Sequence, residues 1–235
     1  MGRIRYSWIN WIACILLIHP AFSQTAMRKN AVNAGYLFSV PREPGAFQRN
    51  WRTGHGVAAE YQAFLSRHSA VFTGVEYAAY PLNSRELANE YNPSQAGLSE
   101  FTFDRGVFRT GVFQAGFRLF LSDALYPITF FTQAAGSLTM MVQDKIRIGQ
   151  VLGGRPFSQT AEAGKSETSP GGQAGLGMRV GISRSVRFML VAEAHAVFSS
   201  DRSDNPDAKI RQLSRAQGKP TVFIVIRSAL EYCFQ

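Results

Sequence analysis

Hydrophobic and polar residues alternate with a period of two along most of this chain. In the segment 171–183 (GGQAGLGMRVGIS), Leu176 and Val180 fall on one side. Gln173 and Arg179 fall on the other side. Because successive side chains of a β-strand point to opposite faces, this pattern predicts a strand with one apolar and one polar face. The pattern recurs and predicts eight strands, at 33–40, 56–65, 70–80, 107–121, 128–141, 171–183, 186–198 and 221–234.

The connections between these segments alternate between short and long. The short ones lie at 66–69, 122–127 and 184–185, and the long ones at 41–55, 81–106, 142–170 and 199–220. A transmembrane β-barrel has short periplasmic turns, longer extracellular loops and an even number of strands. We therefore expect an all-β fold, an eight-stranded antiparallel up-and-down transmembrane β-barrel. Within the second long connection, residues 84–91 (SRELANEY) could form one or two turns of helix.

The N-terminal residues have the features of a cleaved signal peptide. Arg3 and Arg5 precede a mostly apolar run at 8–18, and residues 21–23 (AFS) have the small side chains that signal peptidase reads. The apolar run is too short to span a hydrocarbon core of roughly 30 Å. We expect a signal peptide at 1–23, a periplasmic tether at 24–32, a barrel domain at 33–235, and a location in the cell outer membrane.

Composition adds two constraints to this picture. The chain has 235 residues, 46% of them hydrophobic, and a formal net charge of +9, which by itself would fit either nucleic acid or acidic lipid. The aromatic residues fall on strand faces and are not interleaved with the basic ones, which argues against nucleic-acid binding. Removal of the signal peptide takes Cys14 away and leaves Cys233, so no internal disulfide is expected.

The last strand carries the most specific motif of the chain. Residues 227–234 (RSALEYCF) combine a polar residue, a small residue two positions later and two aromatics at the C-terminal end. With this motif and the loop pattern, the chain resembles the eight-stranded outer-membrane β-barrel family, which includes the transmembrane domain of outer-membrane protein A and outer-membrane protein X. The resemblance implies a monomer whose assembly signal is read by the barrel assembly machinery through Arg227, Ala229, Tyr232 and Phe234. Ala229 replaces the usual Gly, and Gln235 follows the final aromatic.

Side-chain parity assigns most charged strand residues to the interior of such a barrel. The polar faces hold Glu60, Glu76, Arg118, Arg179, Arg187, Glu193, His195, Arg227 and Glu231. Side chains nearly fill an eight-stranded barrel, and an unpaired buried charge is unfavourable, so we expect Glu/Arg pairs that plug the lumen. Glycines on the same faces would leave room for the arginines; they are Gly74, Gly116, Gly175, Gly177 and Gly181. Phe223 and Val225 are apolar exceptions on this side, and Arg109 is a charged exception on the apolar side.

The apolar faces and the long loops predict contacts with lipid. Aromatic girdles at the two membrane interfaces are expected from Tyr61, Tyr77, Phe117, Tyr126, Phe188, Tyr232 and Phe234. Basic residues in or beside the long connections could contact lipopolysaccharide phosphates; they are Arg42, Arg49, Arg52, Arg105, Arg109, Lys145, Arg147 and Arg155. The lipid bilayer and lipopolysaccharide are therefore the expected partners.

Catalytic motifs are absent from the sequence. It contains no Gly-x-Ser-x-Gly, no His-Glu-x-x-His, no phosphate-binding loop and no Cys/His metal spacing. We expect no enzymatic activity, no cofactor, and a structural, adhesive or surface-interaction role. Three alternatives remain open. They are a narrow gated ion channel, a lipid A-modifying enzyme that uses His55 with Ser199 or Ser200 at the outer rim, and a soluble lipocalin-like barrel.

Overall fold

The computed structural model describes eight stretches of the chain. They are residues 30–43, 45–91, 99–104, 106–144, 147–152, 155–160, 166–198 and 220–234. The predicted signal peptide at 1–23 lies outside these residues, and its cleavage stays a prediction.

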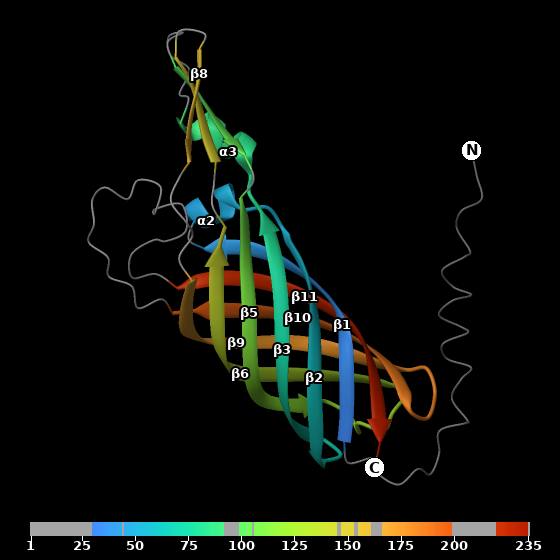
Figure 1. The fold of residues 1–235 in the computed structure, drawn as a ribbon. Coiled ribbons are helices and arrows are strands. Elements are labelled where there is room, and N and C mark those ends of the chain that lie inside the picture. The colour runs from blue at the N-terminus through green and yellow to red at the C-terminus, as the bar shows by residue number, and fades with distance from the viewer. Residues whose placement is uncertain are drawn as a thin grey trace, which may run out of the picture.

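Eight long antiparallel strands close into a single barrel (Figure 1). They are β1 (Asn30–Glu43), β2 (Gly54–Ser66), β3 (Ser69–Pro81), β5 (Val107–Phe120), β6 (Ile128–Gln143), β9 (Ser166–Gly181), β10 (Val186–Val197) and β11 (Thr221–Phe234). Consecutive barrel strands are neighbours, and β1 pairs with β11, with Asn30 opposite Phe234. Closure leaves the barrel without a free edge, as a sheet that crosses a bilayer requires. The predicted fold class is confirmed.

β1 and β9 begin three and five residues before the segments predicted at 33–40 and 171–183. β1 begins at Asn30, so residues 30–32, which the sequence assigns to the tether, pair with both β2 and β11. β9 begins at Ser166, where it pairs with Val142 of β6. The polar run 166–169 shows no alternation that would mark a strand, but backbone pairing does not require one.

The two ends of the barrel differ in how they are closed. The turns β2–β3, β5–β6 and β9–β10 lie at the end where β1 begins and β11 ends, which we call the short-turn end. The opposite, long-loop end carries α2 (Gly45–Asn50) and α3 (Ser84–Tyr91), and α3 confirms the helix predicted at 84–91. Within the described part of the chain, no helix is long and apolar enough to cross a membrane.

A small sheet at the long-loop end has no counterpart in the sequence prediction. It consists of β4 (Ser99–Asp104), β7 (Arg147–Leu152) and β8 (Arg155–Thr160), in the order β4-β7-β8 (Figure 1). β4 comes from one long connection, whereas β7 and β8 come from another. Such pairing between distant segments leaves no local signal in the sequence.

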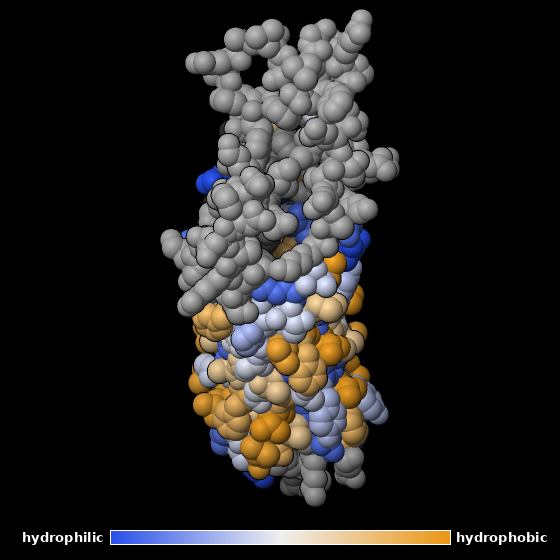
Figure 2. Space-filling model, turned by 60° about the vertical axis from the view of Figure 1, so that its left-hand side comes forward, coloured by the Kyte–Doolittle hydropathy of each residue, from blue (hydrophilic) through white to orange (hydrophobic). Residues whose placement is uncertain are grey.

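Apolar side chains cover the outside of the barrel, whereas most of the charged side chains of its strands are buried inside. Val75, Phe113 and Leu176 are 53, 54 and 65% exposed, whereas Arg118 and Glu231 are fully buried. In Figure 2, hydrophobic residues predominate on the lower part of the visible face, and hydrophilic residues gather above them. A soluble ligand-binding barrel needs the opposite arrangement, so the lipocalin-like alternative is wrong.

Two apolar clusters fill the barrel towards its ends. The long-loop apolar cluster includes Leu37, Trp51, Tyr80, Phe108 and Phe223. The short-turn apolar cluster includes Ala70, Phe120, Ala124, Phe131 and Met189. Phe223 and its neighbour Val225, which break the polar parity of the last strand, therefore pack against other interior apolar side chains at the long-loop end.

Candidate functional site

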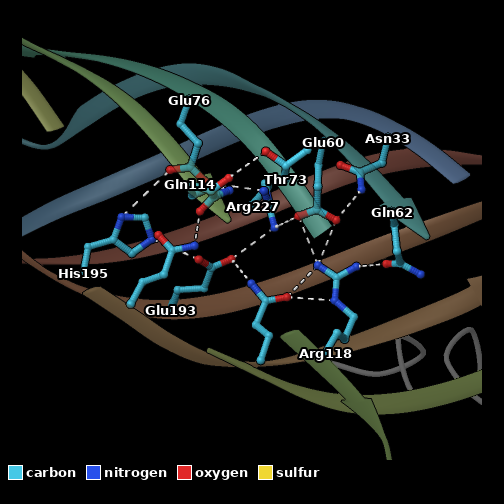
Figure 3. A network of polar contacts seen from close by, with 12 residues as sticks. Asn33, Glu60, Gln62, Thr73, Glu76, Gln114, Arg118, Glu193, His195 and Arg227 are labelled. Atoms are coloured by element: carbon cyan, nitrogen blue, oxygen red, sulfur yellow. Dashed lines mark hydrogen bonds and ion pairs between the residues drawn. The ribbon is translucent and has the colours of Figure 1, made fainter. Parts of the chain in front are cut away.

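Ionisable side chains from five strands meet between the two apolar clusters. This central charge cluster consists of Glu60 on β2, Glu76 on β3, Arg118 on β5, Glu193 and His195 on β10, and Arg227 on β11. Each occupies an inward position because it shares the parity of the buried residues on its strand. All six are buried, and Figure 3 shows them side by side with their contacts as dashed lines.

Arg227 bridges three carboxylates at once. Its Nη2 lies 3.1 Å from Oε2 of Glu60 and 3.2 Å from Oε1 of Glu193. Its Nη1 lies 3.3 Å from Oε1 of Glu76. Charge-assisted hydrogen bonds of this kind are stronger than neutral ones, and burial excludes the water that would weaken them. Arg227 therefore connects β2, β3, β10 and β11 across the interior.

Arg118 makes a second bridge on the same carboxylate. Its Nη2 lies 3.0 Å from Oε1 of Glu60, and its Nε donates to Oε1 of Gln133 at 2.9 Å. Its Nη1 donates to Oε1 of Gln62. The guanidinium carbon also lies 4.5 Å from the ring centroid of Phe131, within cation–π range. Glu60 is thus shared by Arg118 and Arg227.

Neutral amides complete the network, and the sequence prediction did not include them. Asn33 donates to Glu60 at 2.9 Å, Gln114 to Glu76 at 3.1 Å, and Gln133 to Glu193 at 2.9 Å. The alternation of the strands could have identified these three amides, because they occupy inward positions like the charged residues. The prediction missed them because it considered only ionisable side chains.

His195 lies at the long-loop side of the cluster. Its Nε2 lies 2.9 Å from Oε2 of Glu193, and its Nδ1 lies 3.9 Å from Oε2 of Glu76 (Figure 3). Glu76, Glu193 and His195 each offer one possible metal-ligand atom, and the three atoms lie within 4.8 Å of one another.

The remaining predicted lumen residues form a separate group near the short-turn end. In this lower charge cluster, Nε of Arg179 lies 3.5 Å from Oε1 of Glu231, and Nη1 of Arg187 lies 3.9 Å from the same oxygen. Arg179 also donates to the backbone oxygen of Ala124 at 3.0 Å and lies over the ring of Phe120. The nine predicted lumen residues therefore lie inside the barrel, in two clusters.

At four of the five glycines predicted to make room for arginines, the atoms nearest to an added Cβ belong to other residues, which corrects the expectation from the sequence; the four are Gly74, Gly116, Gly175 and Gly177. A Cβ on Gly177 would overlap the ring of Phe131. A Cβ on Gly175 would meet Cγ of Glu193 at 2.7 Å. The space is taken by an aromatic ring and a carboxylate side chain. The arginines instead pass over aromatic faces.

Residues at the outer rim are only partly described. His55 is exposed, contacts the hydroxyl of Tyr36, and lies 5.5 Å from the ring of Phe38 between ring centroids. Ser199 and Ser200, its predicted catalytic partners, lie outside the described residues.

The structure describes six of the eight basic residues predicted to contact lipopolysaccharide. Arg42, Arg49 and Arg52 are exposed, and Arg109 pairs with Asp144. Arg147 and Arg155 begin β7 and β8. Arg105 and Lys145 lie outside the described residues.

The predicted girdle and assembly-signal residues lie on the expected faces. Six aromatics are 37–59% exposed on the outside; they are Tyr61, Tyr77, Phe117, Tyr126, Phe188 and Tyr232. Phe234 is half-buried, and its ring stacks against Tyr232. Ala229 is buried within the short-turn apolar cluster.

Comparisons with known proteins find similar folds at low sequence identity. No family model and no curated protein sequence matches the chain. Neisserial surface protein A is 12% identical, covers 87% of this chain and 97% of its own, and has a TM-score of 0.48. A major outer membrane protein from Thermus thermophilus is 12% identical, with coverages of 89% and 100% and a TM-score of 0.49. The attachment invasion locus protein of Yersinia pestis is 13% identical, with coverages of 88% and 100% and a TM-score of 0.43.

The architecture itself defines the class of this protein. Eight antiparallel strands close on themselves, the outside is apolar, and the inside holds buried ion pairs. Only a closed barrel satisfies every strand hydrogen bond in lipid, and alternating short and long connections are typical of outer-membrane barrels. The chain is an eight-stranded outer-membrane β-barrel that contacts the lipid bilayer, and its location is the cell outer membrane.

Proposed function

We propose that this protein is a non-enzymatic outer-membrane barrel with a structural or surface-interaction role, and that buried side chains plug its lumen. The proposal rests on three clusters of packed side chains that follow one another along the barrel interior. The long-loop apolar cluster, the central charge cluster and the short-turn apolar cluster follow one another between the two ends. An eight-stranded barrel leaves an interior that side chains can fill.

Conductance in planar lipid bilayers tests the plug. The purified full-length protein is expected to give no unitary current steps. The variant Arg118→Ala, which removes one bridge on Glu60, is expected to open a measurable leak. Arg67→Ala, at an exposed pair with Asp123 in the short turns, is the control and should stay silent. Regular current steps from the unmodified protein would overturn the plug and assign a channel. Unchanged lipid A mass in cells that carry the protein would argue against the lipid A-modifying alternative.

The surface role is supported by the structure beyond the barrel at its long-loop end. The sheet β4-β7-β8 and the helices α2 and α3 belong to connections that face the exterior of the cell in this topology. Replacement of 99–104 and 147–160 by Gly/Ser linkers should leave the heat-modifiable mobility of the barrel intact. The same change should reduce attachment of expressing bacteria to epithelial monolayers. Equal attachment by both forms would remove the adhesive role from this sheet.

Exposed arginines at the long-loop end favour lipopolysaccharide as a membrane partner. Arg42, Arg49 and Arg52 are exposed at the long-loop end, where guanidinium groups can bind phosphate in a bidentate manner. Thermal unfolding in lipopolysaccharide vesicles and in phosphatidylethanolamine vesicles tests this. The double variant Arg49→Ser/Arg52→Ser should lose the extra stability that lipopolysaccharide confers. Arg67→Ser, exposed at the opposite end, should retain it.

A further inference from the structure

Two buried ligand-type atoms face each other across a gap in the central charge cluster. Nδ1 of His195 and Oε2 of Glu76 are 3.9 Å apart, which is beyond the usual limit of about 3.2 Å for a hydrogen bond. The other ring nitrogen of His195 is engaged by Glu193 at 2.9 Å. The other oxygen of Glu76 accepts from Gln114 at 3.1 Å and from Arg227 at 3.3 Å. The two facing atoms therefore have only each other among the described residues.

The charges around this gap lack one cation. The cluster holds the carboxylates of Glu60, Glu76 and Glu193 and the guanidiniums of Arg118 and Arg227. The lower charge cluster has the opposite excess, but its second cation, Arg187, lies near the short-turn end and is partly exposed. Each carboxylate contacts a guanidinium, but two guanidiniums leave three carboxylates with one net negative charge when His195 is neutral, and buried net charge is unfavourable. A cation in the gap would offset this negative charge: a monovalent one would cancel it, and a divalent one would leave a single positive charge.

A cavity adjoins the gap on its long-loop side. Glu76 and His195 line it together with the polar side chains of Ser39, Tyr80 and Thr110. About 20 Å³ of it is open to the centre of a water molecule. This is enough for a water molecule or a small ion, because one occupied site needs about 10–15 Å³ by the same measure.

We propose that Nδ1 of His195 and Oε2 of Glu76 bind a divalent transition metal of the Zn²⁺ type, with water from the cavity completing its coordination. Ligand atoms about 2.1 Å from a tetrahedral Zn²⁺ are about 3.4 Å apart. The two atoms lie 3.9 Å apart, so a closure of about 0.5 Å would bring both to zinc-ligand distance. Glu193 holds the far side of the imidazole, as the carboxylate does in carboxylate–histidine–zinc triads. An imidazole ligand favours Zn²⁺ over Mg²⁺ or Ca²⁺, which prefer oxygen alone.

No local sequence motif predicts this site. Glu76 lies on β3 and His195 on β10, and neither strand is a neighbour of the other in the barrel. The Cys/His spacings that mark metal sites in sequences place ligands close together in the chain. Only closure of the barrel brings these two side chains face to face across the lumen.

Isothermal titration of the full-length protein with Zn²⁺ alone, after treatment with a chelator, tests the proposal. We expect one Zn²⁺ per barrel and no comparable binding of Mg²⁺. His195→Asn and Glu76→Gln should each weaken Zn²⁺ binding by about 10-fold or more. Glu231→Gln is the matched control, because it neutralises a fully buried carboxylate in the lower charge cluster, and it should bind Zn²⁺ like the unmodified protein. A heat-dependent gel shift verifies that each variant is folded.

X-ray absorption at the zinc edge provides a second readout. A first shell of nitrogen and oxygen at about 2.0–2.2 Å with imidazole scattering is expected, and the imidazole signal should vanish in His195→Asn. Glu193→Gln should keep the imidazole signal and weaken affinity by about 10–100-fold. The proposal would be overturned if the unmodified protein did not bind Zn²⁺. It would also be overturned if His195→Asn and Glu76→Gln bound Zn²⁺ as tightly as the unmodified protein. Either result would leave a protonated His195 and a bridging water as the occupants of the gap.

Discussion

Arg227 on the last strand and Glu60 on the second barrel strand are ion-paired at 3.1 Å, although 167 positions separate them in the sequence. Their strands are not adjacent, since β1 lies between β11 and β2. The pair therefore crosses the interior of the barrel. It fixes the position of both strands relative to the carboxylates on β3 and β10.

Removal of Arg227 should destabilise the barrel strongly. Arg227→Ala leaves three buried carboxylates without their shared guanidinium. Breaking a buried ion pair by removing one partner lowers the free energy of unfolding by about 3–5 kcal/mol. Urea unfolding in phospholipid vesicles, followed by tryptophan fluorescence, measures the change. Arg67→Ala breaks an exposed pair and should cost about 1 kcal/mol or less. Similar losses for the two variants would contradict the structural role of the network.

The interior glycines should differ from the lipid-facing ones in their tolerance of a methyl group. In Gly177→Ala the new Cβ overlaps the buried Phe131 ring, which packs edge-on against Phe120. Overpacking of this kind lowers the free energy of unfolding by about 1–3 kcal/mol.

Gly136→Ala is the control for this change. A Cβ at Gly136 meets nothing within 4 Å, so the variant should be neutral or slightly stabilising. The double variant Gly177→Ala/Phe131→Leu should recover part of the stability lost in Gly177→Ala. A lack of recovery would show that the ring is not the obstacle.

A charge on the outer surface should be tolerated according to its depth in the bilayer. Phe113 lies at the middle of β5 and is 54% exposed, so Phe113→Arg should destabilise by about 2–4 kcal/mol. Leu121 follows the end of β5 at the short-turn end and is also exposed, so Leu121→Arg should cost only about 0–1 kcal/mol. Equal effects in vesicle unfolding experiments would argue against a transmembrane orientation along the barrel axis.

The C-terminal aromatic should control assembly more than stability. Phe234→Ala removes the last aromatic of the expected assembly signal, so less folded barrel should reach the outer membrane. Phe198→Ala removes an exposed aromatic just after β10 and serves as the control. The fraction with heat-modifiable mobility in isolated outer membranes is the measurement. A normal fraction for Phe234→Ala would show that the assembly machinery reads other residues.

Local patterns account for the parts of the site that the sequence predicted. Alternation placed Glu60, Arg118 and Arg227 inside, since a strand sends every second side chain to the same face. It did not separate the central from the lower charge cluster, because parity says nothing about height along the barrel. It also left Phe223 and Val225 as exceptions, although both belong to the long-loop apolar cluster.

The sequence by itself determined the number of barrel strands, the side of each that faces lipid, and the order of short and long connections. These features follow from a period of two and from turn length, which are local properties of the chain. Only the tertiary structure decided that Arg227 serves three carboxylates, that β4 pairs with β7, and that His195 faces Glu76. Those contacts depend on strand register and barrel closure, which join residues far apart in the chain and leave no periodic trace within either segment.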